Sequence, residues 1–152
     1  MANTYTRIYL HYVFAPKYRA ALITEEHRER AQRFLAKTLK ERDHSPIAIH
    51  CEPDHVHTFF RLRITDPVTV LINQLKTNSS RDFKRWLHPE FAWQVGGGLF
   101  SVSRWDVEKI AAYVRNQKAH HARQTFLQEY EALLRRHGVD DYDERYLLTE
   151  PI

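Results

Sequence analysis

The sequence has little of what marks secreted, membrane-spanning or low-complexity proteins. Its only cysteine, Cys51, excludes an internal disulfide framework and suits the reducing cytoplasm. No apolar run approaches the ~20 residues that a membrane span needs, and residues 1–12 lack the charged leader and apolar stretch of a signal peptide. With 4 glycines and 6 prolines, the chain is neither repetitive nor disordered. We therefore expect a cytoplasmic protein without a membrane partner.

The residues that are present suit one compact domain with a basic surface. Apolar residues make up 43% of the 152 residues, which is enough for one core, and no shift in composition marks a second unit. We therefore expect a single domain over residues 1–152. The net charge of +4 is compatible with a nucleic-acid partner, although many unrelated proteins carry the same excess.

The hydrophobic patterning predicts an alternation of strands and helices. Period-two runs of aromatic and β-branched residues indicate strands, whereas apolar residues at helical spacing, preceded by capping residues, indicate helices. Strands are expected at residues 4–14, 46–51, 55–64, 91–95 and 99–102, and helices at residues 25–42, 67–88, 103–120 and 125–136. This order predicts an α+β sandwich of the ferredoxin-like or RRM-like kind, with helices packed on an antiparallel sheet and further helices at the C-terminus.

Two histidines share one face of the predicted strand at residues 55–64. Side chains alternate along a strand, so His55 and His57 point away from the apolar face, which is formed by Val56, Thr58, Phe60, Leu62 and Ile64. The two rings lie about 7 Å apart at ~3.3 Å per residue, so both can converge on one ion. Asp54 can orient one ring as a hydrogen-bond acceptor. A His-x-His pair alone is a weak motif, and two solvated histidines on a half-exposed strand are the alternative interpretation.

Tyr113 and Gln117 are four residues apart on the predicted helix at residues 103–120. They lie on one line, about a quarter-turn from the apolar stripe of that helix. The stripe consists of Val107, Ile110, Ala111 and Val114. Both side chains therefore lie where the edge of the helix meets the sheet. Taken singly, such a tyrosine more often packs with its hydroxyl in water, and such a glutamine is usually solvated.

Together, these four side chains form a workable site for chemistry at a phosphate. Two imidazoles and an amide oxygen are an incomplete, fairly hard ligand set, which leaves room for phosphate oxygens and suits Mg²⁺ or Mn²⁺. A tyrosine one helical turn from a ligand is within reach of a phosphate bound there, so in-line attack and release of a 3′-oxygen are feasible. The resulting phosphotyrosine ester keeps the bond energy, so a second 3′-hydroxyl can rejoin strands without ATP.

Longer motifs follow one another along almost the whole chain. They are Tyr5–Phe14, Lys17–Arg19, Pro53–His57, Leu75–Ser80, Trp93–Gln94 with Gly96, Gly98 and Phe100–Ser101, Tyr113–His121, Phe126 with Glu129–Tyr130, and Tyr142–Leu147. With these motifs the sequence resembles the single-tyrosine HUH transposases of the insertion sequence 200/605 group. One such segment can arise by chance, whereas all of them in order are hard to explain otherwise.

The resemblance implies which residues carry the chemistry. In that family the His-hydrophobic-His pair and the glutamine four residues after the tyrosine bind the cation, and the tyrosine is the nucleophile. These positions correspond to His55, His57, Gln117 and Tyr113. The resemblance also implies DNA transposition on hairpin-forming, single-stranded element ends. It further implies a homodimer whose sheets join, with the tyrosine helix completing the partner's site.

Three positions depart from the pattern of that family. Gly97 stands where the family commonly has an aromatic residue, and Leu99 stands where it has alanine, so we expect a more mobile loop before the tyrosine helix. Thr58 replaces a usual aliphatic residue after the second histidine. On the core face a threonine is tolerated if its hydroxyl finds an acceptor.

Basic and aromatic side chains are candidate DNA contacts. Cationic groups bind phosphates in a salt-dependent and largely sequence-blind way, and aromatic rings stack on unpaired bases. The candidates are Lys17, Tyr18, Arg19, Lys76, Arg81, Lys84, Arg85 and Arg115. Each of them, taken alone, is equally compatible with a solvated surface position.

Two other functions are compatible with the same residues. A non-catalytic or domesticated single-stranded nucleic-acid-binding domain would share the fold and the basic surface, with structural histidines. A metal-dependent hydrolase would activate water and tolerate the loss of the Tyr113 hydroxyl. Formation of a covalent protein–DNA adduct distinguishes the transposase from both.

Overall fold

The structure is a computed structural model that describes residues 4–142 of the chain, so the motif Tyr142–Leu147 lies, except for its first residue, outside the described residues. Its strands are β1 (Ile8–Phe14), β2 (Ser45–Glu52), β3 (His55–Leu62) and β4 (Gly98–Val102). Its α-helices are α1 (Arg28–Glu41), α2 (Val68–Trp86), α3 (Val107–Arg115), α4 (Gln117–His121) and α5 (Phe126–Arg136). Single 3₁₀ turns lie at Lys17–Arg19, Glu25–His27 and Arg104–Asp106.

The four strands form one antiparallel sheet in the order β2-β3-β1-β4. The two strands that are central in the sheet, β1 and β3, are separated in sequence by α1 and β2, and β4 joins β1 after α2. This is the strand order of the ferredoxin-like sandwich, so the predicted α+β fold is confirmed.

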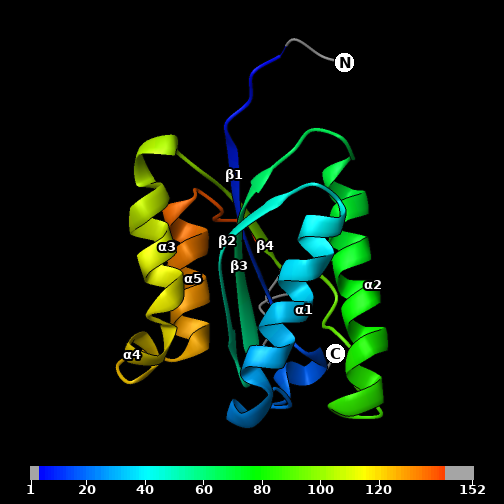
Figure 1. Ribbon diagram of the computed structural model, residues 1–152. Coiled ribbons are helices and arrows are strands. Elements are labelled where there is room, and N and C mark those ends of the chain that lie inside the picture. The colour runs from blue at the N-terminus through cyan, green and yellow to red at the C-terminus, as the bar shows by residue number, and fades with distance from the viewer. Residues whose placement is uncertain (1–3, 143–152) are drawn as a thin grey trace.

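Helices cover both faces of the sheet. In Figure 1, α1 and α2 lie on one side of the sheet and α3 and α5 on the other. The face toward α1 and α2 carries the larger apolar cluster, which includes Leu10, Tyr12, Phe14, Val56, Phe60 and Leu62 from the sheet. Alternation along residues 55–64 predicted one core face, whereas the structure buries both faces, so side chains of the second face are also withdrawn from water.

Thr58 lies on the face toward α1 and α2, where the sequence analysis placed it. The side chain is fully buried, and its hydroxyl donates a hydrogen bond of 3.1 Å to the carbonyl oxygen of Tyr12 on β1. The acceptor that a buried threonine needs is therefore present, and the expectation for this departure is confirmed.

The predicted strand at residues 91–95 is wrong. This segment makes only an isolated bridge, between Trp93 and Pro16. Phe91 and Trp93 alternate in the sequence because both rings enter the core, where they lie 5.1 and 6.0 Å from the ring of Phe83. Two buried aromatic rings in an irregular segment therefore imitate the period-two pattern of a strand.

The predicted helix at residues 103–120 is divided in two. The hydroxyl of Ser103 accepts a hydrogen bond from the amide of Trp105 and opens the 3₁₀ turn before α3. Asn116, with φ −97° and ψ 22°, leaves the helical conformation between α3 and α4. Tyr113 and Gln117 therefore belong to consecutive short helices rather than to one.

The glycine loop before β4 lies close against β1. The φ of Gly97 is +151°, and a Cβ atom there would be 2.8 Å from the carbonyl oxygen of Val13. The ammonium of Lys76 on α2 donates to the carbonyl oxygens of Gln94 and Gly96, at 2.9 and 2.6 Å. Gly97 therefore permits a contact that a larger residue would prevent, and the greater mobility of this loop stays a prediction.

The start of α5 is fixed by a capping box. The hydroxyl of Thr125 accepts from the amide of Gln128 at 3.2 Å, and the side chain of Gln128 accepts from the amide of Thr125 at 3.0 Å. We expect Thr125→Ala to lower the free energy of unfolding by about 1 kcal/mol, because an orphan amide loses its partner. Urea denaturation measures this, with Thr77→Ala on the exposed face of α2 as the control. Equal losses in both variants would contradict the capping role.

Within residues 4–142, no helix combines the length and the apolar character needed to cross a membrane.

Candidate active site

Polar side chains from five elements gather where the sheet passes beneath α3, α4 and α5. They are His11 of β1, His55 and His57 of β3, Tyr113 of α3, Gln117 and His121 of α4, and Glu129 of α5. The three strand histidines and Gln117 are at most 1% exposed, and Glu129 is 2% exposed. All four residues predicted to form the site thus lie within one cluster.

The two predicted histidine ligands have their Nδ1 atoms engaged and their Nε2 atoms directed to a common centre. Nδ1 of His55 lies 2.8 Å from a carboxylate oxygen of Asp54, as the sequence analysis proposed, and Nδ1 of His57 lies 2.8 Å from Nε2 of His11. The two Nε2 atoms lie 3.6 and 3.2 Å from the same oxygen, Oε1 of Glu129. Asp54 and His11 therefore orient the two rings from the Nδ1 side, which faces away from this oxygen.

His11 reaches His57 because of the strand register. His11 pairs with Phe59, and the neighbouring pair joins Val13 to His57, so His11 and His57 are diagonal neighbours on one face of the sheet. Their rings stack with centroids 5.0 Å apart. His11 was not recognised from the sequence as part of the site.

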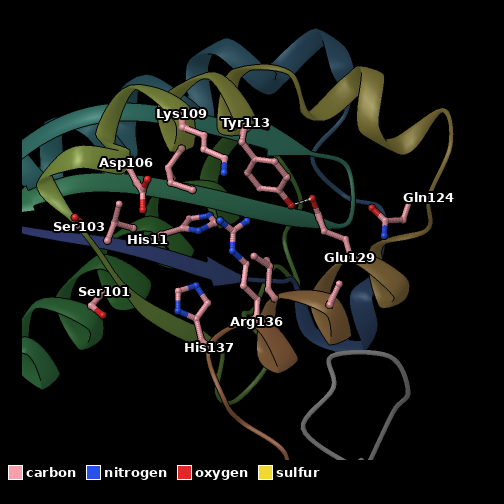
Figure 2. A pocket seen from close by; sticks show the side chains of 14 residues that line it. His11, Ser101, Ser103, Asp106, Lys109, Tyr113, Gln124, Glu129, Arg136 and His137 are labelled. Atoms are coloured by element: carbon pink, nitrogen blue, oxygen red, sulfur yellow. Dashed lines mark hydrogen bonds between the residues drawn. The ribbon is translucent and has the colours of Figure 1, made fainter.

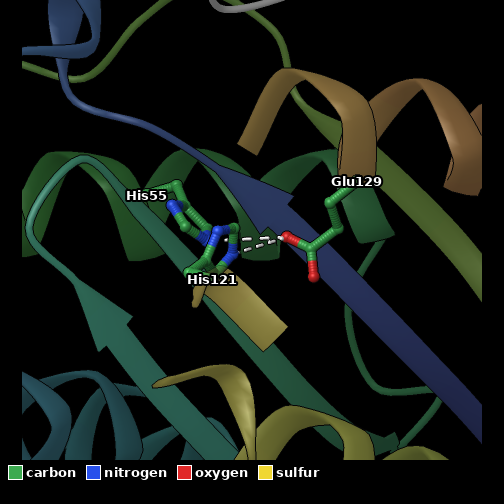
Figure 3. Close-up of side chains that lie close together, drawn as sticks. All are labelled: His55, His121 and Glu129. Atoms are coloured by element: carbon green, nitrogen blue, oxygen red, sulfur yellow. Dashed lines mark hydrogen bonds and ion pairs between the residues drawn. The ribbon is translucent and has the colours of Figure 1, made fainter. Parts of the chain in front are cut away.

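The carboxylate of Glu129 is the hub of the cluster. Figure 3 shows it facing the imidazoles of His55 and His121, and its Oε1 lies 3.1 Å from Nε2 of His121. Its Oε2 accepts a hydrogen bond of 2.9 Å from the side-chain amide of Gln117. The Tyr113 hydroxyl donates a short hydrogen bond to the same Oε2, as Figure 2 shows. One carboxylate thus connects the tyrosine to the imidazoles.

Gln117 presents its amide oxygen to the imidazoles. This Oε1 lies 3.5 Å from Nε2 of His55 and 3.0 Å from Nε2 of His121. The side-chain nitrogen also donates to the carbonyl oxygen of Tyr113 at 3.4 Å, across the break between α3 and α4. Gln117 therefore lies beside His55, as a continuous helix would also have placed it, although it belongs to α4 and not to the helix of Tyr113.

Burial and neighbouring charges set the protonation of the cluster. Burial lowers the pKa of His57 to about 4 although Glu129 opposes the shift, so the imidazole is neutral. Burial alone would raise the pKa of Glu129, but hydrogen bonds from His121 and His57 hold it well below its usual range. Burial, reinforced by Glu129, raises the pKa of Tyr113 above its ordinary value. The phenol is therefore protonated and must lose its proton as it attacks.

The residues fit a divalent cation. Coordination through Nε2 requires each ring to carry its proton on Nδ1, where Asp54 and His11 are placed to accept it. Burial lowers the pKa of His11 well below its ordinary value, so its imidazole is neutral and has an acceptor nitrogen. Two imidazole nitrogens and the amide oxygen of Gln117 then form an open set of donors, and the binding of a cation by these three residues stays a prediction.

A cavity opens beside the tyrosine, between α3, α5 and β4. Its volume is about 300 Å³, and its lining includes Tyr113, Glu129, Lys109 and Arg136. Figure 2 shows the last two directed into it from opposite helices. The lining also includes Asp106, so it carries two carboxylates as well as two cations. A cavity of this size can admit a phosphate beside Lys109 and Arg136.

Three of the predicted DNA contacts lie near the site. Arg19 forms an ion pair of 3.3 Å with Asp54, which in turn holds His55. Tyr18 is 50% exposed and, like Arg19, has a left-handed backbone, with φ values of 62° and 50°. Such conformations are unusual for residues other than glycine and concentrate at functional sites. Lys17 precedes them in the same 3₁₀ turn.

The other predicted DNA contacts lie farther from the cluster. Arg81, Lys84 and Arg85 belong to α2, which Figure 1 shows on the opposite face of the sheet. The ammonium of Lys76 is bonded to the glycine loop. Arg115 at the end of α3 donates to the carbonyl oxygen of Ile47 on β2. The structure therefore does not bring these basic residues together with the imidazoles.

Glu129 and His121 belong to the motifs that carry the resemblance, but neither was assigned to the site from the sequence. The signal for Glu129 is its spacing within α5, whose buried residues include Phe126, Tyr130, Leu133 and Leu134. Glu129 lies three residues after Phe126, so helical periodicity puts its carboxylate on the apolar face. A glutamate in such a stripe is a sign of a buried partner. His121 has no comparable signal, because it is half-buried on a helix of five residues.

Comparisons with known proteins agree with this picture. A sequence profile described as IS200-like transposase matches residues 4–117. A structure from Deinococcus radiodurans R1 assigned as a transposase has a TM-score of 0.62 at 21% identity, covering 77% of this chain and 95% of its own. A REP-associated tyrosine transposase bound to a REP hairpin has a TM-score of 0.58 at 15% identity, covering 80% and 73%. Identities this low show a shared fold. Among curated protein sequences, none matches this chain.

The fold and the cluster together define a class of protein, an α+β sandwich in which paired strand histidines lie beneath a helix that carries a tyrosine. The profile match extends over residues 4–117 of the 152-residue chain. The chain belongs to the IS200-like transposase family.

Proposed function

We propose that the protein binds hairpin ends of an insertion element as single-stranded DNA, cuts one strand with Tyr113 and rejoins strands. The supporting observation is that the Tyr113 hydroxyl and the imidazole of His57 contact the same carboxylate, that of Glu129, within one chain. A nucleophile and a candidate cation site are thus separated by a single side chain.

The proposed roles follow from the contacts of each side chain. His55, His57 and Gln117 would hold Mg²⁺ or Mn²⁺ through their converging nitrogen and oxygen donors. When bound, such a cation neutralises charge on the phosphate and on the departing 3′-oxygen. Asp54 and His11 orient the two imidazoles. The hydrogen bond to Glu129 fixes the direction of the Tyr113 hydroxyl.

Tyr113 would act as the nucleophile in an in-line displacement. The bond between its oxygen and phosphorus forms while the bond from phosphorus to the 3′-oxygen breaks. The phenol gives up its proton to solvent and the departing 3′-oxygen takes one up, which leaves a 5′-phosphotyrosine ester and a free 3′-hydroxyl. Since the ester keeps the energy of the phosphodiester, a second 3′-hydroxyl can displace the tyrosine and join strands. Transposition and recombination require this reversibility, which hydrolysis by water would remove.

The DNA would approach from the side of the cavity between α3 and α5. Lys109 and Arg136 line it together with Tyr113, so backbone phosphates can be held close to the phenol. The turn that contains Lys17, Tyr18 and Arg19 lies on the other side of His55. Arg19 pairs with Asp54, and Asp54 contacts the His55 ring. Arg115 and the basic residues of α2 would serve more distant parts of the strand or its hairpin.

A homodimer is part of the proposal because the resemblance implies one. The resemblance also implies that the tyrosine helix completes the partner's site. In the structure, however, Tyr113 lies beside the histidines of its own chain, with its ring 5.8 Å from that of His57. We propose that this arrangement within one chain is competent for cleavage.

A covalent adduct assay tests the proposed function. Labelled single-stranded DNA with the hairpin end of the element is incubated with protein and Mg²⁺, Mn²⁺ or EDTA, then separated under denaturing conditions. We expect a cation-dependent protein–DNA adduct together with a free 3′-hydroxyl on the released strand. Free 5′-phosphate ends without an adduct would indicate a hydrolase. Binding without cleavage in any cation would indicate a nucleic-acid-binding domain.

Asp54 provides a test of the cation site that is independent of DNA. Its carboxylate orients the ring of His55, so Asp54→Ala is expected to weaken Mn²⁺ binding by roughly 10- to 100-fold. Isothermal titration calorimetry measures the change, with Asp140→Ala at an exposed position as the control. An unchanged Kd for Asp54→Ala would show that His55 needs no such support.

A further inference from the structure

Glu129 brings a buried negative charge to the point where the imidazoles converge. Its Oε1 lies 3.2 Å from Nε2 of His57, 3.1 Å from Nε2 of His121 and 3.6 Å from Nε2 of His55. The residue is 2% exposed. Glutamate is almost never buried unless it is paired or bound to a metal, because desolvation of a carboxylate is costly. Its position therefore calls for a functional explanation.

We propose that Glu129 is a further protein ligand of the divalent cation, bound through Oε1, and that its Oε2 holds the Tyr113 hydroxyl beside that cation. The proposal rests on the proposed function, since it concerns the same site. It adds a residue of α5, which lies beyond residues 4–117 matched by the family profile. The carboxylate of Glu129 would thus contact both the Tyr113 nucleophile and the ion.

The separation of the donor atoms supports coordination. Ligand atoms of His55, His121 and Glu129 all lie within 4.8 Å of one another. Ions of this class bind their ligands at roughly 2.0–2.6 Å, so two ligands of one ion are no more than about 5 Å apart. The carboxylate is therefore already within the range that a single cation can bridge, without a change in the position of α5.

The charge of the ligand set also favours Glu129. His55, His57 and Gln117 would all bind as neutral donors, which leaves a divalent ion in a buried site without a compensating negative charge. Mg²⁺ and Mn²⁺ prefer oxygen ligands, and carboxylates in particular, over imidazoles. Adding Glu129 supplies both the oxygen and the negative charge. The added carboxylate therefore brings the ligand set closer to what Mg²⁺ and Mn²⁺ prefer than two imidazoles and an amide alone.

The two oxygens of the carboxylate have different partners. Oε1 faces the imidazoles, whereas Oε2 accepts hydrogen bonds from Tyr113 and Gln117. Coordination through Oε1 leaves these two bonds in place. The phenol is then held next to the ion before DNA arrives, which is the preorganisation that an in-line attack requires.

The competing explanation is that Glu129 imitates a phosphate. A carboxylate bonded to His57, His121 and Tyr113 would then occupy the place of the substrate, and α5 would have to withdraw before cleavage. The two explanations make opposite predictions. A ligand is needed for cation binding, whereas removal of a phosphate mimic leaves the cation affinity unchanged or higher and strengthens DNA binding.

Mn²⁺ titration of the full chain without DNA tests the ligand assignment. The probe is the electron paramagnetic resonance signal of free aqueous Mn²⁺, recorded for the wild type, Glu129→Gln and Glu131→Gln. Glu131→Gln is the matched control, because it makes the same charge change on α5 at a residue that contacts Tyr142 instead of the imidazoles. We expect Glu129→Gln to raise the Kd for Mn²⁺ at least tenfold and Glu131→Gln to leave it within twofold.

An unchanged or lower Kd in Glu129→Gln would overturn the ligand assignment. If Glu129→Gln does not fold, as judged by circular dichroism, a wild-type measurement decides. In protein labelled with ¹³C at glutamate Cδ, substoichiometric Mn²⁺ should broaden one buried carboxyl resonance selectively. Absence of such a resonance would equally count against coordination. Neither readout involves DNA, so a failure of adduct formation overturns the strand-transfer function while leaving the ligand result standing.

Discussion

Tyr113→Phe is expected to reduce covalent adduct formation by roughly three orders of magnitude or more, because removal of a nucleophile eliminates the step that it performs. The ring of Tyr113 packs edge-on against the imidazoles of His11 and His57, with centroids 6.2 and 5.8 Å away. Phenylalanine keeps these ring contacts and loses only the hydroxyl, which donates a hydrogen bond to Glu129. Folding and binding of the hairpin DNA should therefore be unchanged.

The measurement is adduct yield under denaturing conditions, alongside hairpin affinity from fluorescence anisotropy. Tyr9→Phe is the matched control, because Tyr9 is a buried tyrosine on the same face of the sheet, next to Phe59. It should form the adduct as the wild type does. An undiminished adduct in Tyr113→Phe would assign the nucleophile to another residue, and a parallel loss of DNA binding would make Tyr113 a binding residue.

The fold was predictable because its signals are local. Alternation in the segment at residues 55–64 predicted a strand whose histidines share one face, and β3 places them so. Helical periodicity likewise predicted α1, α2 and α5 within a few residues of their observed ends. The failures occurred where tertiary packing decided the conformation. Phe91 and Trp93 alternate to fill the core rather than to form a strand, and Asn116 interrupts a continuous helical pattern.

Only part of the site could be predicted from the sequence. Its other residues join the histidines only because α3, α4 and α5 cover the second face of the sheet. Nothing near His55 in the sequence indicates that α5 will cover it. Yet the ring of Phe126 stacks on that of His55 at 4.0 Å, and Glu129 follows one turn later on the same face of the helix. Alternation along residues 55–64 predicted one core face, and two solvated histidines on a half-exposed strand were the alternative interpretation. The structure buries them, and burial is what makes Glu129 and His11 part of the site.

A mixture of two inactive variants, Tyr113→Phe and His57→Asn, is expected to remain inactive. In the structure the Tyr113 hydroxyl and the His57 imidazole of one chain contact the same Glu129 carboxylate. If cleavage uses this arrangement, every chain in the mixture lacks either the nucleophile or a cation ligand, whatever the chains assemble into. Adduct yield should therefore stay at the background of each variant alone, at least roughly a hundredfold below wild type.

His57→Asn suits this experiment because a shorter amide can keep the contact that Nδ1 makes with His11 while removing Nε2. Both variants should therefore fold, which circular dichroism verifies before mixing. The opposite outcome has a defined size. In a dimer whose tyrosine helices act on the partner's site, half of the randomly reassorted dimers are mixed and one of their two sites is intact, so about a quarter of wild-type activity returns. Recovery of that order would show that the nucleophile acts between subunits, and that the contacts of Tyr113 with its own Glu129 describe a resting state.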